Sequence, residues 1–382
     1  MSSTTNPDNE IIEARPERGN RLEMVALGAP ENLLGLSLTE LEARVVAMGW
    51  PKYRARQIWS GLYRRGASHI DEMTDLSKVD RARLAEGYAV RHPSVLTRQQ
   101  SADGTEKFLL AMDDGSAIES VFIPDGRRRT LCISSQVGCT LDCTFCLTAQ
   151  QKFKRNLRAH EIVGQLLAVS RALPDTEGIT NVVFMGMGEP LANLPQVTEA
   201  ITRMTSPHGL NLSPRRITLS TAGLVPQMIR FWQGPPPTVN LSISLNATTD
   251  ALRDRIMPAV NGLYPLATLL AACRDAPLPS RRRITFEYVL LGHENDSLED
   301  AARLIRITHG VRCKINLIPF NPFPGSPFRR PSDERVLAFQ RMLHAGGLTA
   351  MLRKSRGVDI LAACGQLNSE WTAGAAAACA TS

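Results

Sequence analysis

The stretch that decides the fold and the chemistry is Cys139-Thr-Leu-Asp-Cys143-Thr-Phe-Cys146, which follows a segment that predicts a strand. Three thiolates so close together can bind three irons of a cubane cluster and leave the fourth iron without a protein ligand. Structural zinc instead needs four ligands, usually as two paired clusters, and the sequence has no second C-x2-C pair. The pattern therefore predicts an iron–sulfur cluster with an open coordination position, with structural zinc as the alternative.

An open iron can bind the amino and carboxylate groups of S-adenosylmethionine, and a reduced cluster can cleave the sulfonium to a 5′-deoxyadenosyl radical. A second segment, Gly186-Met-Gly-Glu189-Pro, suits that cofactor. A carboxylate at a strand end can accept from the ammonium of the methionine moiety, and glycines allow close backbone approach. Taken alone, the same segment is typical of a simple turn.

Six short apolar runs surround these segments and alternate with helical stretches such as 161–173 and 297–308. This alternation predicts βαβ units and a parallel sheet. Six units are too few for a closed eight-stranded barrel, so we expect an α/β fold with a partial (β/α)6 TIM-like barrel and its site at the carboxyl ends of the strands. Residues 348–353 predict a further strand. The six runs are 131–134, 181–185, 217–221, 239–245, 284–291 and 315–320.

The domain organisation that we expect has five parts, with the catalytic barrel over residues 130–370. Residues 31–95 predict a small helical accessory domain with interleaved basic and aromatic side chains. These suit either RNA contacts or a solvated basic face over an aromatic core. Residues 96–129 predict a β-hairpin linker around an Asp-Asp-Gly turn, and the ends, 1–30 and 371–382, are expected to be flexible tails.

Composition sets the broad class. The chain has 382 residues, a net charge of +7 and 43% hydrophobic residues, which suits a globular protein and favours a polyanionic partner without proving one. It has no apolar run of ~18 residues that would span a membrane, and its polar first thirty residues are typical of a flexible tail rather than a signal peptide. We therefore expect a cytoplasmic protein, in which cysteines indicate metal binding or catalysis more often than disulfides.

Five segments together are similar to the RlmN family of radical S-adenosylmethionine enzymes, in the same order and over roughly Leu34 to Leu367. The resemblance implies a radical S-adenosylmethionine barrel that methylates carbon 2 of an adenosine in 23S rRNA, in the peptidyl transferase region, and of an adenosine in the tRNA anticodon loop. The five segments are Leu131 to Cys139, Thr148 to Leu157, Gly186 to Asn193, Asn316 to Gly325 and Ala362 to Leu367.

The resemblance also implies the cofactor contacts. Cys139, Cys143 and Cys146 would hold one [4Fe-4S] cluster. Without the resemblance, the polar residues at the strand ends would more often be turn or cap residues. Many relatives carry His in place of Asn246, and Leu147 replaces a small polar residue. The residues implied to bind S-adenosylmethionine are Gly188, Glu189, Ser220, Ser244, Leu245, Asn246 and Asn321.

Two further cysteines would carry the methyl group, again by resemblance. Cys364 would take it from one S-adenosylmethionine and become S-methylcysteine; a second S-adenosylmethionine would supply the radical that joins this carbon to the RNA. Cys132 would resolve the adduct through a transient disulfide with Cys364. Glu119 would accept a proton, although on an alternating strand it would otherwise be expected to face solvent. Cys273 and Cys313 are expected to be core residues.

The same resemblance implies the binding partners and defines the alternative functions to be considered. The expected partners are 23S rRNA, tRNA and an electron donor such as flavodoxin, and the expected state is a monomer. One rival is the related enzyme that methylates carbon 8; another is a non-catalytic RNA-binding protein with a structural metal centre. Several basic groups, some predicted near the cluster, are candidates for RNA contacts: Arg127–Arg129, Lys152, Lys154, Arg155, Arg158, Arg281–Arg283, Arg329, Arg330 and Arg353–Arg356.

Overall fold

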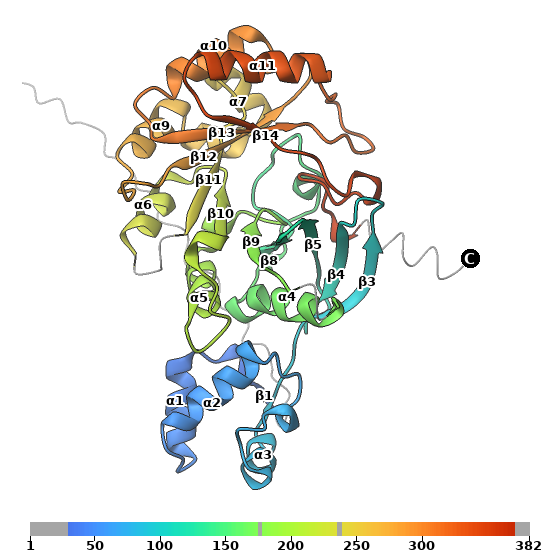
Figure 1. Cartoon of the computed structure of the whole chain (residues 1–382), viewed down its shortest axis with the longest axis vertical. Helices are drawn as coiled ribbons and strands as arrows, with labels where there is room; N and C mark the ends of the chain where they lie inside the picture. Colours follow the sequence, from blue (N-terminus) through green and yellow to red (C-terminus); the bar gives the residue numbers. More distant parts are fainter. Residues whose placement is uncertain (1–29, 175–177, 235–238, 371–382) are drawn as a thin grey trace, which may run out of the picture.

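A ten-stranded sheet organises the computed structural model, which describes residues 30–174, 178–234 and 239–370 (Figure 1). The two expected tails, apart from Pro30, and Cys379 lie outside the described residues. The strand order is β14-β13-β12-β11-β10-β9-β6-β5-β4-β3. The strands are β3 Ser94–Gln100, β4 Glu106–Ala111, β5 Ala117–Asp125, β6 Arg128–Cys132, β9 Asn181–Phe184, β10 Ile217–Thr221, β11 Asn240–Ser244, β12 Ile284–Leu290, β13 Cys313–Pro319 and β14 Ala350–Leu352.

The parallel part of this sheet runs from β6 through β9, β10, β11 and β12 to β13, with the short β14 added beyond β13. Each connection carries at least one helix, as parallel pairing requires. The prediction of an α/β fold with six parallel units is confirmed, including the extra strand near residue 350. The helices are α4 Ala159–Ala172, α5 Leu194–Thr205, α6 Val225–Gln233, α7 Asp250–Ile256, α8 Pro258–Leu263, α9 Leu266–Arg274, α10 Leu298–Ile307 and α11 Asp333–Ala345.

The antiparallel strands β3, β4 and β5 extend the same sheet beyond β6. Sequence patterning predicted the β4–β5 hairpin but described residues 96–129 as a linker. Because β5 pairs with β6 from Val121↔Cys132 to Asp125↔Arg128, these strands are instead continuous with the barrel. The alternation of polar and apolar residues along the chain predicts the hairpin. The further strand with which the hairpin pairs is decided by the tertiary structure.

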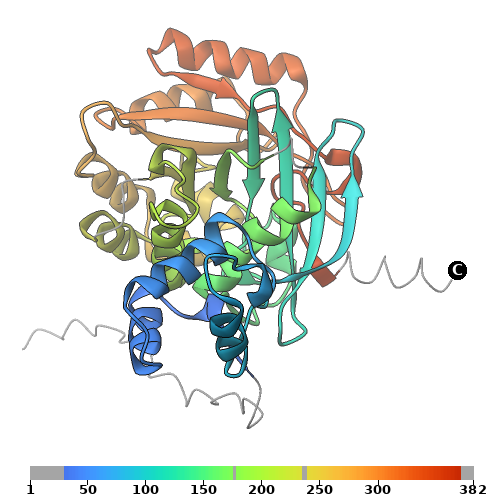
Figure 2. The ribbon, with the colours of Figure 1, turned by 60° about the horizontal axis from the view of Figure 1, so that its bottom comes forward.

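The amino-terminal helices form a small unit beside the barrel, next to α4 and α5 (Figure 2). Trp50, Trp59 and Tyr63 are buried in its core, and Tyr53 is exposed. This burial favours an aromatic core over base stacking for the first three residues. The elements are β1 Glu31–Asn32, η1 Leu33–Gly35, α1 Leu38–Ala47, α2 Tyr53–Trp59, a π-helical turn Ser60–Arg64, η3 Ile70–Glu72, α3 Lys78–Ala85 and β2 Tyr88–Ala89.

Arg203 of α5 joins this unit to the barrel. It donates to the Leu34 carbonyl at 2.6 Å and to the Tyr63 hydroxyl at 3.0 Å, and its guanidinium lies over the Trp59 ring. These bonds satisfy a nearly buried cation and fix the two parts to each other.

Short elements around the cysteine-rich loop complete the fold: β7 Gln136–Val137, η4 Leu147–Gln150, β8 Arg155–Asn156, η5 Pro190–Asn193, η6 Pro214–Arg216 and η7 Val358–Ile360. None of the helices in the described residues is both long and apolar enough to cross a membrane.

Candidate active site

The three cysteines of the C-x3-C-x2-C run line one cavity of about 140 Å³ at the carboxyl ends of the parallel strands. Their loop is fixed by a close backbone approach at Gly138, whose φ is +78° and whose added Cβ would lie 2.3 Å from the Lys152 carbonyl. Gln136 completes the support, since its Oε1 accepts from the Glu189 amide at 3.0 Å. The loop therefore holds its thiols in one fixed arrangement.

Burial raises the pKa of Cys139 to about 12, that of Cys143 well above its usual range, and that of Cys146. Such thiols ionise when a metal supplies positive charge. The described residues contain no group of three His, Cys, Asp or Glu side chains that could hold a single metal ion. A cubane requires one thiolate on each of three irons, and the three thiols line one cavity, so these residues fit the cluster.

The Gly-Met-Gly-Glu segment follows β9 and borders the same cavity. An added Cβ at Gly188, where φ is +96°, would lie 2.5 Å from the Gln136 Cβ, and one at Gly186 would lie 2.7 Å from the Ile133 backbone. The glycines are therefore required by packing against the strand that leads to the cluster loop.

Glu189 is buried, and its carboxylate accepts from the Leu191 amide at 3.0 Å and from the Ala222 amide at 2.7 Å. Burial raises its pKa despite these bonds. A buried carboxylate is stabilised by a cation, and two oxygens retain free lone pairs for one. The methionine ammonium of S-adenosylmethionine fits this requirement.

The other residues expected to bind S-adenosylmethionine do not all line the same cavity. Ser220, Ser244 and Asn246 line the cavity with the cysteines, whereas Leu245 is fully buried behind it. Asn246 has a φ of +58°, which asparagine tolerates, and its Oδ1 accepts from the Val289 amide at 2.9 Å. Asn321 lies in an adjoining cavity, where its Oδ1 is buried with no hydrogen-bond partner in the described residues. Such an acceptor fits a ligand donor.

Cys364 is carried on a segment that is bonded along its length to the cluster loop. The Leu147 amide donates to the Gly365 carbonyl at 2.7 Å, and the Thr148 hydroxyl donates to the Leu367 carbonyl at 2.6 Å. Two regions more than two hundred residues apart in sequence are therefore held side by side. Cys364 consequently lines the cluster cavity and is also exposed to the larger cavity inside the barrel.

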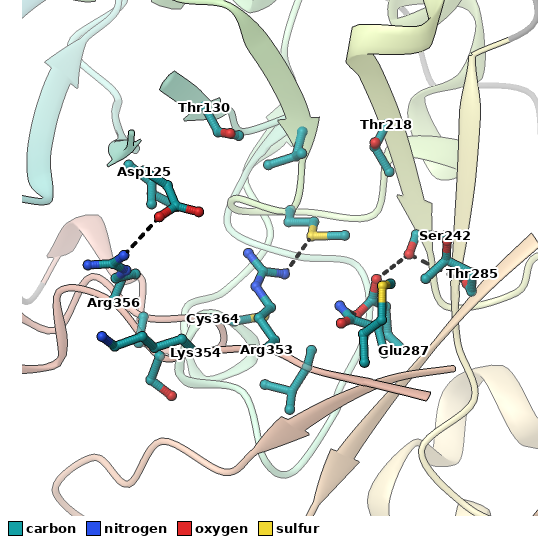
Figure 3. A pocket seen from close by; sticks show the side chains of 18 of the residues that line it. Asp125, Thr130, Thr218, Ser242, Thr285, Glu287, Arg353, Lys354, Arg356 and Cys364 are labelled. Atoms are coloured by element: carbon teal, nitrogen blue, oxygen red, sulfur yellow. Dashed lines mark hydrogen bonds and ion pairs between the residues drawn. The ribbon is translucent and has the colours of Figure 1, made fainter. Parts of the chain in front are cut away.

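The larger cavity, about 380 Å³ in volume, brings Cys364 together with Arg353, Glu287 and Met185 (Figure 3). The Arg353 guanidinium donates to the Met185 sulfur at 3.2 Å. Desolvation of the thiol inside the barrel raises the pKa of Cys364, and the Arg353 charge opposes that rise. Sequence reasoning assigned Arg353 only to a group of basic residues, because its proximity to a thiol depends on how the chain returns to the barrel.

Cys132 ends β6 and is buried, and its thiol lies near enough to that of Cys364 for the two to interact electrostatically. Burial raises the pKa of Cys132 to about 12, the charge of Cys364 adds to the rise, and Arg353 opposes it. All cysteines in the described residues are free thiols. Cys273 and Cys313 are buried core residues, as predicted.

Glu119 on β5 is completely buried, so the solvent-facing alternative is wrong. Its carboxylate lies 3.2 Å from the Lys107 ammonium and accepts from the Asn368 amide at 2.7 Å. It therefore anchors the segment that carries Cys364, and it does not line the cavities described above. The burial arises because β5 is an inner strand of the sheet rather than part of an isolated hairpin.

Residues 133–305 match the radical SAM superfamily, and residues 31–90 match the amino-terminal domain of ribosomal RNA large subunit methyltransferases. The fold and the site thus define a radical S-adenosylmethionine enzyme, and the cofactors of that class are a [4Fe-4S] cluster with three cysteine ligands and S-adenosylmethionine.

The chain is 52% identical to the dual-specificity RNA methyltransferase RlmN of Syntrophobacter fumaroxidans, over 88% of this chain and 97% of that protein. It is 54% identical to the corresponding protein of Geobacter sulfurreducens, over 88% and 91%. A radical SAM methyltransferase from Sphaerobacter thermophilus superposes with a TM-score of 0.84 at 44% identity, over 89% of this chain and all of that one. The chain belongs to the RlmN family.

Proposed function

We propose that this enzyme methylates carbon 2 of an adenine in 23S rRNA and of an adenine in the tRNA anticodon loop, with Cys364 as the methyl carrier. The observation that supports this most directly is that Cys364, a cysteine outside the cluster motif, lines the cavity of the three cluster cysteines and lies near a second such cysteine, Cys132. Relatives at about half identity are dual-specificity RNA methyltransferases, which agrees with two RNA substrates.

The cofactors would be held at the carboxyl ends of the strands. Cys139, Cys143 and Cys146 would ligate the cluster, while Glu189 would accept from the ammonium of S-adenosylmethionine. The pair supplies a 5′-deoxyadenosyl radical when the cluster is reduced. The further proposed contacts to S-adenosylmethionine are Gly188, Ser220, Ser244, Leu245, Asn246 and Asn321.

Cys364 would accept a methyl group as a thiolate, because adenine carbon 2 lies between two ring nitrogens and is too electron-poor to be the nucleophile. The thiolate would displace the sulfonium sulfur and form a carbon–sulfur bond. Arg353 favours the ionised thiol by its charge. Cys364 also faces the barrel interior, where an adenine can approach it.

Cys132 would release the product. Once the methyl-derived carbon is joined to adenine carbon 2, the Cys132 thiolate would attack the sulfur of Cys364. The disulfide would form as the carbon–sulfur bond breaks, and the carbon on the RNA would keep the electron pair and take up a proton to become the methyl group. A thiol reductant would then restore both cysteines. We propose that Glu119 accepts the proton that leaves carbon 2. Since its carboxylate is held by Lys107 and the Asn368 amide, this step requires the segment around Cys364 to move.

The test is mass spectrometry of nucleosides from unmodified 23S rRNA and tRNA after incubation with reduced, cluster-loaded protein and methyl-labelled S-adenosylmethionine. We expect labelled 2-methyladenosine with the wild-type protein and none with Cys364→Ala. Cys132→Ala should instead accumulate a covalent protein–RNA adduct. A carbon 8 product would replace this proposal with the rival activity, and unlabelled RNA would exclude RNA methylation.

A further inference from the structure

Six cations gather at the amino-terminal end of the barrel, opposite the cluster. They line a cavity of about 430 Å³ whose lining, within the described residues, includes no aspartate or glutamate. Each lies within or just before a parallel strand, so adjacent strands bring them together although they are far apart in sequence. The six are Arg127, Arg128, Arg215, Arg216, Arg283 and Lys314.

These six cations differ from the other candidates for RNA contacts in whether a carboxylate pairs with them. In the part of the chain that the structure describes, none of the six forms an ion pair with a carboxylate, whereas several of the other candidates do. Arg155 pairs with Asp114 and Glu161, and Lys154 pairs with Glu370. Some basic groups were expected near the cluster. The set without carboxylate partners in the described residues lies at the other end of the barrel and includes Arg215, Arg216 and Lys314, which are not among the candidates from the sequence.

Three of the six cations, Lys314, Arg283 and Arg128, lie close enough to act on one another. Burial lowers the pKa of Lys314, and the nearby charges of Arg283 and Arg128 lower it further, with Glu287 opposing. Like charges that outnumber the nearby carboxylate attract anions, and a concave surface strengthens the effect. A polyanion with regularly spaced charges can bind several of the six cations at once.

The cationic cavity and the barrel interior that contains Cys364 share part of their lining. Arg128, Thr218, Thr285 and Lys314 border both the cationic cavity and the barrel interior, and Cys364 lines the far part of that interior. The interior is polar, unlike a closed barrel filled by branched apolar side chains. Thr130, Thr218, Ser242 and Thr285 point into it (Figure 3).

We propose that the RNA loop enters the barrel through its amino-terminal end, where the six cations bind its phosphates while the target adenine extends to Cys364. This inference rests on the proposed function and adds the RNA's entry side and the residues that bind it. Carbon 2 of a stacked adenine is inaccessible, so an extruded loop nucleotide suits a polar barrel interior.

The first experiment compares RNA affinity at several salt concentrations for the wild-type protein and the triple variant Arg215→Ala, Arg216→Ala and Arg283→Ala. The three side chains are exposed, so folding should be unaffected. We expect the variant to lose at least tenfold in RNA affinity. The slope of the logarithm of the binding constant against the logarithm of the salt concentration should become shallower by about 0.7 for each single-strand phosphate that the variant no longer binds. The matched control is Arg306→Ala, Arg335→Ala and Arg341→Ala, exposed cations of α10 and α11.

Equal losses in the two triple variants, or an unchanged affinity and salt slope in the first, would overturn the proposal. Methylation of Cys364, read as a protein mass shift without RNA, should be the same in all three proteins. Because affinity is measured without turnover, its result is separate from the wild-type nucleoside assay, in which the proposed function succeeds or fails.

The second experiment locates the RNA directly. A photo-crosslinker on Arg216→Cys should capture nucleotides next to the target adenine, and the same group on Arg341→Cys should not. Crosslinks from Arg341→Cys at equal yield, or none from Arg216→Cys, would contradict entry at the amino-terminal end.

Discussion

The two ends of the barrel differ in how their polar groups are satisfied. At the carboxyl end, Glu189, Gln136 and Glu119 are buried and bonded, and glycines remove Cβ atoms that would separate the loops. At the amino end, exposed cations such as Arg216 surround an open cavity whose described lining has no carboxylate. The first arrangement fixes reacting groups, whereas the second leaves charge available for a large anion.

This difference means that substitutions at the two ends should have separable effects. Carboxyl-end changes should reduce chemistry or stability and spare RNA affinity. Amino-end changes should reduce RNA affinity and spare the fold, because exposed charges contribute little to folding.

The largest effect is expected from Cys143→Ala. Removal of one thiolate should prevent cluster assembly and reduce methylation to background, while RNA affinity stays within twofold of wild type. Iron content, S-adenosylmethionine cleavage and RNA binding measure the three consequences. Cys313→Ala, at a core cysteine, is the control and should retain iron. A parallel loss of RNA binding in Cys143→Ala would show that the two ends are not independent.

A smaller loss is expected from Gly188→Ala. The added Cβ would lie 2.5 Å from Gln136 at a φ of +96°, so the loop beside Glu189 must shift. We expect S-adenosylmethionine affinity to fall at least tenfold, measured by calorimetry on cluster-loaded protein. Gly115→Ala is matched, since its φ is +80° but its Cβ would meet nothing within 4 Å. Equal affinities in the two variants would mean that the close approach does not matter.

Lys107→Met should reduce stability rather than cofactor binding. It leaves the buried carboxylate of Glu119 without its ammonium partner, which costs about 3–5 kcal/mol of unfolding free energy. Lys154→Met removes an exposed pair with Glu370 and should cost less than about 1 kcal/mol. Chemical denaturation compares the two variants, and similar midpoints would refute the idea that the carboxyl end depends on buried polar bonds.

The smallest effect concerns thiol reactivity. Arg353 lowers the thiol pKa of Cys364, so Arg353→Gln should reduce the thiolate fraction at neutral pH and slow its alkylation, by about tenfold per pKa unit. Cys132, with a pKa of about 12, should stay nearly unlabelled until the pH approaches that value. Mass spectrometry of cluster-loaded protein from neutral to alkaline pH measures both rates. Unchanged labelling of Cys364 would exclude an electrostatic role for Arg353.

Much of the fold could be predicted because its signals are local. The runs at 217–221 and 284–291 predicted β10 and β12 nearly to the residue. In β10 the buried Ile217 and Leu219 alternate with the half-buried Thr218 and Ser220, which is the period-two pattern of a strand. The cluster cysteines lie within one short loop, so their spacing is also a local signal. Family resemblance added Cys132 and Cys364, which no local pattern would have paired.

Local residue patterns were enough to predict the six strand–helix units, the cluster motif and the glycine-rich loop, because each depends on neighbours a few residues away. Only the tertiary structure decided that Glu119 is buried against Lys107, that Arg353 reaches Cys364, and that cations from separate strands meet at one mouth. These arrangements depend on strand order and on the return of the carboxyl-terminal segment. Both are set by the packing of the whole sheet rather than by local residue patterns.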